Sequence, residues 1–206
     1  MYYEIKSITN CARKYANFLN DYEPYQEIRD FGRIGQEFKG FSNTPIIFER
    51  DKRYKNNEPI SDFLLNDWAE IIVSERIYKM LKEKYSSEID FYECFANDEG
   101  ILKPYYILRR KEQLDVLDKT FYNAIDPILG VMRNILVDNI PDKYNYFDVK
   151  YGATNVISKK LYDDLQALSP TNFEVTPIAT TSEELKAREK NLAKKNDKLD
   201  SDEFIN

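Results

Sequence analysis

The stretch VSERIYKML at residues 73–81 has a close counterpart in ISKKLYDDL at residues 157–165. Each stretch begins with an apolar residue and a serine, and serine is favoured at the N-cap of a helix. The apolar residues that follow are spaced as on one face of an α-helix. At the same offset of 84 residues, IDF at residues 89–91 corresponds to FEV at residues 173–175, an alternation typical of a strand. The sequence therefore predicts a helix–strand unit that occurs twice.

Further strands and helices are predicted around this repeat. Alternating patterns predict strands at residues 1–8, 45–48, 135–137 and 146–149, and a β-hairpin over 88–109 that turns at Asn97–Gly100. Apolar spacing predicts a helix from Thr9 to Tyr22 and another over 114–125. Since two copies are too few for a solenoid, which needs about three repeats or more, we expect one α+β domain with a mixed or antiparallel sheet.

The repeat also predicts the core. Ile77, Leu81, Leu161 and Leu165 occupy equivalent positions on the inner stripes of the two helices. We therefore expect all four side chains to be buried in one common core.

The composition changes at the end of the chain. Residues 181–206 contain few apolar side chains and many Lys and Glu, although Thr181-x-x-Glu184 has the pattern of a helix capping box. We predict a domain over residues 1–180 and a charged helical or disordered tail over 181–206. Truncation after Ala179 is expected to leave a folded domain.

The composition excludes several classes of function. The 206 residues have a net charge of −6 and include no histidine, which excludes His-dependent triads and His-containing zinc sites. The two cysteines, Cys11 and Cys94, cannot form a four-Cys metal site, so no metal or cofactor is predicted. No apolar run is long enough to cross a membrane and no signal peptide is recognised, so we expect a cytoplasmic protein without membrane partners.

Candidate catalytic and nucleic-acid sites are weak. Asp115 with Asp118, and Asp163 with Asp164, are interpreted as solvated helix faces. The basic run at residues 109–111 follows two tyrosines, but the chain is acidic overall. We interpret this run as a strand end whose side chains reach solvent, and not as a nucleic-acid site. No catalytic residue is predicted.

The charge distribution is more informative. Residues 51–100 hold 12 Asp and Glu against 7 Lys and Arg, a net of −5, whereas the other 156 residues contribute −1. Strand alternation is expected to turn Glu88, Asp90 and Tyr92 outward, with further acidic residues upstream and at the hairpin tip. Such a surface would attract a basic protein partner and anchor it through Tyr92. The predicted partner-binding residues are Asp62, Asp67, Glu70, Glu88, Asp90, Tyr92, Asp98 and Glu99.

The same segments carry a resemblance to a known family. They are, in order, Gly40, PIIF (45–48), PISDFL (59–64), IVSERIYKML (72–81), IDFYE (89–93), YYIL (105–108), VLD (116–118), Phe147, VISKKL (156–161) and FEVTP (173–177). In this order and spacing the chain resembles the family-eleven immunity proteins of bacterial polymorphic toxin systems, over most of residues 1–180. The resemblance implies a non-enzymatic antitoxin that binds and neutralises a cognate secreted toxin in competition between bacteria.

Two other functions stay open at this point. One is an enzyme that uses carboxylate and Tyr side chains, which would require a cleft with two convergent carboxylates. The other is a structural module that assembles with itself, which would require a self-complementary apolar surface.

Overall fold

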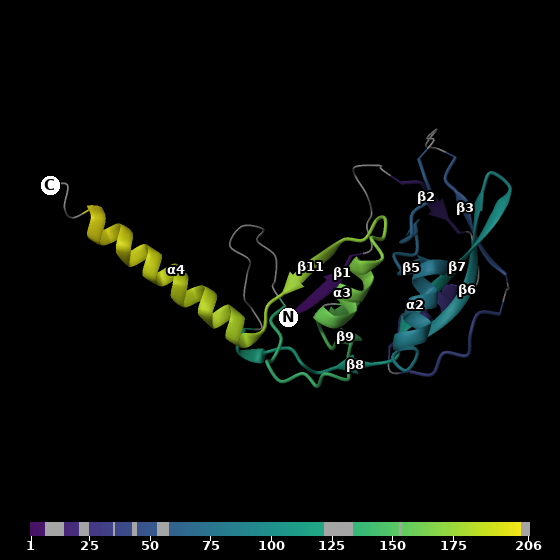
Figure 1. Ribbon diagram of the computed structural model, residues 1–206. Helices are drawn as coiled ribbons and strands as arrows, with labels where there is room; N and C mark the ends of the chain where they lie inside the picture. The colour runs from purple at the N-terminus through teal and green to yellow at the C-terminus, as the bar shows by residue number, and fades with distance from the viewer. Residues whose placement is uncertain are drawn as a thin grey trace.

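The computed structural model describes residues 1–6, 15–20, 25–34, 36–42, 45–52, 58–121, 134–152 and 154–202. In this part of the chain, four α-helices and eleven strands form an α+β fold, as the sequence predicts (Figure 1). None of the described helices is long and apolar enough to span a bilayer. The elements are β1 (Tyr2–Ile5), β2 (Asn17–Leu19), α1 (Tyr25–Phe31), β3 (Ile46–Arg50), β4 (Leu65–Asn66), β5 (Ile72–Ser74), α2 (Glu75–Tyr85), β6 (Ile89–Asp98), β7 (Ile101–Arg110), β8 (Gln113–Leu114), the 3₁₀ turn η1 (Lys119–Phe121), β9 (Tyr146–Val149), β10 (Val156–Ser158), α3 (Lys159–Ala167), β11 (Val175–Ile178) and α4 (Thr181–Asp202).

The strands form two sheets that contain equivalent halves. One sheet has the order β11-β1-β10-β9-β8 and the other β4-β2-β3-β6-β7-β5. In each sheet, one middle strand pairs antiparallel with two others: the strand before the repeated helix and the strand after it. The order is β5-β7-β6 in one sheet and β10-β1-β11 in the other. The middle strand differs in origin, because β7 follows β6 along the chain whereas β1 is the first strand. The duplicated unit is therefore a three-stranded sheet with one helix.

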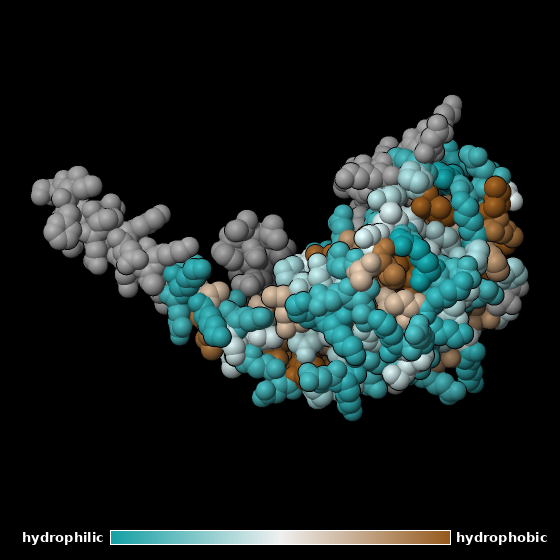
Figure 2. Space-filling view, viewed as in Figure 1, coloured by the Kyte–Doolittle hydropathy of each residue, from teal (hydrophilic) through white to brown (hydrophobic). Residues whose placement is uncertain are grey.

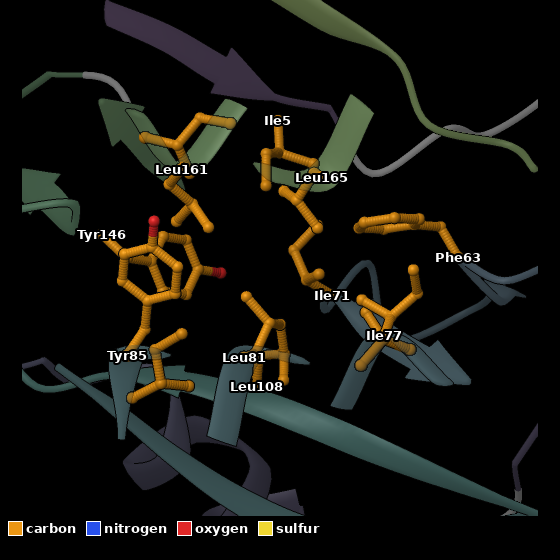
Figure 3. Close-up of a cluster of buried hydrophobic side chains, with 13 residues drawn as sticks. Ile5, Phe63, Ile71, Ile77, Leu81, Tyr85, Leu108, Tyr146, Leu161 and Leu165 are labelled. Atoms are coloured by element: carbon orange, nitrogen blue, oxygen red, sulfur yellow. The ribbon is translucent and has the colours of Figure 1, made fainter. Parts of the chain in front are cut away.

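The two helices share one hydrophobic core. Ile77 and Leu81 of α2 and Leu161 and Leu165 of α3 are all at most 2% exposed and belong to one cluster, so their predicted burial is confirmed. Figure 3 shows Leu161 and Leu165 of α3 pointing towards α2, from which Leu81 and Ile77 point back. A second core, around Phe18, covers the opposite face of β6 and β7.

Two predicted helices are wrong in their described part. Asn17–Leu19, within the helix expected from Thr9 to Tyr22, is strand β2, which pairs with β3 and β4; residues 7–14 and 21–24 lie outside the described residues. In the helix expected over 114–125, the described residues form β8 and the single 3₁₀ turn η1. Tertiary pairing outweighs helical apolar spacing in both segments. The strand expected at 135–137 is reduced to bridges made by Leu136.

The helix at the end of the chain begins in contact with the rest of the domain. Its capping box lies one residue earlier than predicted, since the N–H of Thr180 donates to the carboxylate of Glu183. The N–H of Thr181 donates to the carbonyl of Leu136, and Ser182 bonds Asp138. Beyond this turn α4 extends away from the two sheets (Figure 1). These contacts favour a domain that continues a few residues past the predicted boundary at 180.

Truncating either leucine of the shared core should destabilise the fold. We expect Leu81→Ala and Leu165→Ala each to lower the free energy of unfolding by about 2–5 kcal/mol, because each leaves a cavity in a packed interior. Leu185→Ala is the matched control, since Leu185 is 48% exposed on α4 and should cost less than about 0.5 kcal/mol. Urea unfolding measures all three, and equal effects would contradict the shared core.

Two truncations should distinguish the stability contributed by the first turn of α4, which contacts the domain, from that contributed by the rest of the helix. Ending the chain after Glu189 should change the free energy of unfolding by less than about 0.5 kcal/mol, because the removed part of α4 extends away from the sheets. Ending it after Ala179 removes the partners of Leu136 and Asp138 and should cost about 1–3 kcal/mol, while the domain stays folded. Thermal unfolding of both truncations gives the comparison, and an equal stability of the two would show that the first turn contributes nothing.

Candidate partner-binding surface

Three of the predicted binding residues lie inside the protein. Asp62 accepts hydrogen bonds from Ser74 (2.7 Å), from the backbone N–H and hydroxyl of Thr171 (both 2.9 Å), and from the guanidinium of Arg76. Glu88 accepts from the side-chain amide of Asn145 at 2.9 Å and from backbone N–H groups beside it. Asp62 and Glu88 are each 9% exposed, so these carboxylates support the fold.

Glu70, the third of them, faces the buried Arg110. The guanidinium of Arg110 lies 3.5 Å from the carboxylate of Glu70 and 2.9 Å from that of Asp148. Burial raises the pKa of Glu70, against the lowering effect of Arg110. Because both acids are oriented towards one guanidinium in the interior, Glu70 is not available to a partner.

Of the other five predicted residues, Asp67 and Glu99 are exposed, whereas Asp90, Tyr92 and Asp98 are half-buried. Asp67 accepts from the backbone N–H of Asn20, and Asp90 pairs with Lys111 at 3.3 Å. Asp98 pairs with Arg50 (2.7 Å) and Lys103 (3.0 Å). Burial opposes ionisation of Asp98, but these two cations hold its pKa below the usual value. Glu99 is exposed at the hairpin tip.

Tyr92 is not an outward anchor. Its ring packs edge-on against Phe31, Phe38 and Phe41, with centroid distances of 5.6, 5.3 and 5.7 Å. The even-numbered residues of β6 face this second core, whereas strand alternation was expected to expose them. The prediction of a single exposed acidic surface centred on Tyr92 is therefore wrong, because β6 is covered on both faces near its start.

Arg109 and Arg110 correct another expectation. Both are 4% exposed, so they are not solvent-reaching side chains at a strand end. Arg109 donates to the carbonyls of Phe31, Arg33 and Gln36 and thereby holds the segment after α1 against β7. Buried arginines that are satisfied in this way fix neighbouring backbone.

The convergent carboxylates do not form a catalytic cleft. Glu70 and Asp148 converge, as the two carboxylates of an enzyme would have to, but the guanidinium of Arg110 lies between them. The cavity beside Glu70 is about 10 Å³, which is room for roughly one water molecule. Among the described residues, no group of three or more Cys, Asp and Glu side chains is placed to hold a metal ion.

A surface that α2 does not cover begins beyond the first turn of this helix. The 11 residues of α2 span about 16 Å, whereas the 10 residues of β6 span about 33 Å. Helix α2 therefore covers only the first part of the strand, where Tyr78 packs against Phe91 and stacks on Tyr106. Beyond Tyr106, none of the described helices covers the same face of β6, β7 and β3.

This surface is apolar and acidic, and we call it the outer face. The register places Phe95 opposite Ile47 and Pro104, and Asn97 opposite Glu49 and Leu102. Leu102 is 51% exposed, and Glu49 and Glu93 are exposed carboxylates. Figure 2 shows hydrophobic residues gathered over the far end of the β6–β7 hairpin. The outer face consists of Ile47, Glu49, Glu93, Phe95, Asn97, Leu102 and Pro104.

A groove opens at one border of the outer face, and we call it the slot. It has a volume of about 500 Å³, within the range of ligand-binding sites. The described residues of one wall precede or begin β3, and the other wall is β6. Its lining residues are Gly40, Phe41, Pro45, Ile46, Phe91, Tyr92, Glu93 and Phe95.

Sequence reasoning missed most of this surface. It placed Phe95 on the inward face with Ile89 and Phe91. The three residues do share one face of β6, but the helix that covers this face is shorter than the strand. The available signal was length, because a hairpin of 22 residues predicted over 88–109 is longer than one short helix can cover. Glu93 lies on the same face of the strand as Phe95, so it was the acidic residue that could have indicated this surface.

Comparison with known proteins adds no assignment. The chain matches no protein-family model, and no curated protein matches it significantly.

Stability should depend on pH through Asp62. Burial opposes ionisation of Asp62, but hydrogen bonds from Arg76, Thr171 and Ser74 outweigh it and hold the pKa well below its usual range. A carboxylate with a lowered folded-state pKa stabilises the fold above its unfolded pKa of about 3.9, and this stability is lost as the pH falls through the folded value.

The variant Asp62→Asn tests this dependence. At pH 7 it should lower the free energy of unfolding by about 1–3 kcal/mol. The difference from the wild type should shrink only below about pH 4. Denaturant unfolding between pH 2 and 7 measures the difference, and a constant difference would exclude ionised Asp62 as its source.

Proposed function

We propose that this chain is a cytoplasmic immunity protein that binds and neutralises a cognate secreted toxin, without enzymatic activity of its own. The binding surface in this proposal is the outer face. The observation that supports it most is a sheet face that combines exposed Leu102 and half-buried Phe95 and Ile47 with two exposed carboxylates. Contiguous exposed apolar patches are typical of protein–protein interaction sites.

The charge of the outer face favours a basic partner. Glu49 and Glu93 are exposed, and the seven residues of the outer face include no Lys or Arg. The nearby cations Arg50 and Lys103 are paired with Asp98. An acidic surface increases the association rate with a basic protein, and salt weakens this effect.

The toxin as partner is supported by the sequence. The ordered segments between Gly40 and Pro177 resemble immunity proteins, and several of them lie in β3, β6 and β7, the strands that form the outer face. The proposed mechanism is sequestration, in which the toxin is held in a stable complex.

Co-expression with the protein encoded by the adjacent gene, where the family that the chain resembles has its toxins, tests the proposal. The chain should rescue cells and co-purify with the toxin. The double variant Glu49→Lys/Glu93→Lys should raise the Kd at least about tenfold and slow association at low salt, because it reverses the charge that attracts the partner.

The matched control is Glu174→Lys/Glu189→Lys, which makes the same charge change outside the outer face. It should leave the Kd within about twofold, since these sites are remote from the interface. Rescue without a stable complex would exclude sequestration. Equal weakening by both double variants would assign the effect to net charge, and rescue unaffected by either would exclude the outer face.

A further inference from the structure

A stacked pair of tyrosines occurs in both copies of the duplicated unit. In the first copy, Tyr78 of α2 stacks on Tyr106 of β7, with ring centroids 3.6 Å apart and ring planes at 7°. In the second, Tyr162 of α3 stacks on Tyr3 of β1 at 4.2 Å and 19°. The two pairs are equivalent in the register of β7 with β5 and of β1 with β10. Since both copies keep the stack, it is a packing feature of the unit.

The residue opposite the strand tyrosine differs between the copies. Glu93 of β6 lies opposite Tyr106, whereas Pro177 of β11 lies opposite Tyr3. Burial raises the pKa of Tyr106, and the charge of Glu93 raises it further, as expected for a carboxylate close to the phenol. The first copy therefore has an anionic group where the second has an apolar ring.

Glu93 is exposed, and among the described residues its carboxylate has no ion pair and no hydrogen-bond donor. The other carboxylate of the outer face, Glu49, accepts a hydrogen bond from Asn97. Lys79, which acts on the hydroxyl of the same strand tyrosine, is paired with Glu75 at 2.9 Å. A protein that covers Glu93 removes its charge from water, which is unfavourable unless that protein supplies a cation.

We propose that Glu93 and the adjoining tyrosines, Tyr78 and Tyr106, bind an arginine side chain of the partner protein. The guanidinium donates two N–H groups to the carboxylate and lies against the aromatic rings. Arginine fits this site better than lysine, because its planar group forms paired hydrogen bonds with a carboxylate and stacks on aromatic rings. This inference rests on the proposed function and adds the type of residue by which the partner is held.

Titration with an isolated arginine tests the site without any toxin. The isotope-labelled full chain is titrated with N-acetyl-arginine amide and followed by NMR. We expect saturable shift changes at Glu93, Tyr78 and Tyr106. N-acetyl-lysine amide should bind at least about threefold more weakly. The citrulline analogue, which has nearly the shape of arginine but no charge, should bind at least about tenfold more weakly.

The chain contains its own controls for this titration. Tyr3 should show no saturable change in the same spectra, since Pro177 replaces the carboxylate. Glu93→Gln should raise the Kd of the arginine probe at least about tenfold, whereas Glu49→Gln on the same face should leave it within about twofold. Equal changes at both tyrosine pairs, equal binding of citrulline, binding retained by Glu93→Gln, or no saturable change would each overturn the inference.

The complex with the protein of the adjacent gene provides a second measurement. Glu93→Gln should raise the Kd of this complex at least about tenfold, and so should replacing one particular arginine of the partner by Glu. Glu93→Arg should restore binding to that partner variant.

The two proposals can fail separately. A stable complex that Glu93→Gln leaves unchanged would overturn the arginine site and retain sequestration. Arginine binding by the chain without rescue or a complex would retain the arginine site and exclude that protein as its partner.

Discussion

Two buried carboxylates join the halves of this protein, and the rest of the structure depends on them. Asp62 holds the start of α2 through Ser74 and also binds Thr171, which follows α3. Glu88 follows α2 and binds Asn145, whose side chain holds Ser158 at the start of α3. The start of each helix is therefore joined, through these hydrogen bonds, to a residue in the loop that follows the other helix. A buried carboxylate is tolerated only when its hydrogen bonds are satisfied, so the relative position of the halves is strongly restricted.

The buried arginines extend this restriction to the strands. Arg110 of β7 lies between Glu70 of its own half and Asp148 of the other. Asn155, also in the second half, accepts from Arg110 at 2.6 Å. Separating the halves would leave the guanidinium or the carboxylates unpaired in an apolar interior, which is more costly than losing the pair itself. The base of the β6–β7 hairpin is therefore fixed, and its outer end projects from a rigid support.

The outer face results from an unequal covering of this hairpin. On one side, α1, β2 and the segment after α1 bury Phe48, Cys94 and Ala96 in the second core. On the other side, α2 and the core shared with the second half cover the sheet among the described residues, and this cover reaches to about Tyr106. In the second half the equivalent strands β1 and β11 have four residues each and do not project in this way. Among the described residues, the proposed binding surface therefore belongs to the first copy of the duplicated unit.

The sequence by itself determined the repeated unit and its core. Serine caps and apolar residues at helical spacing are local signals, so α2, α3 and the burial of Leu81 and Leu165 were predictable, as was the β6–β7 hairpin from its turn at Asn97–Gly100. The sequence also indicated an acidic region around residues 51–100. Which of these acids reach solvent was decided only by tertiary structure, because Asp62, Glu70 and Glu88 find their partners 12 to 109 residues away. Tertiary pairing also made β2 from a helix-like segment and supplied β1 as the middle strand of the second half. Such partners are distant along the chain, and strand pairing depends on neighbours that local periodicity does not specify.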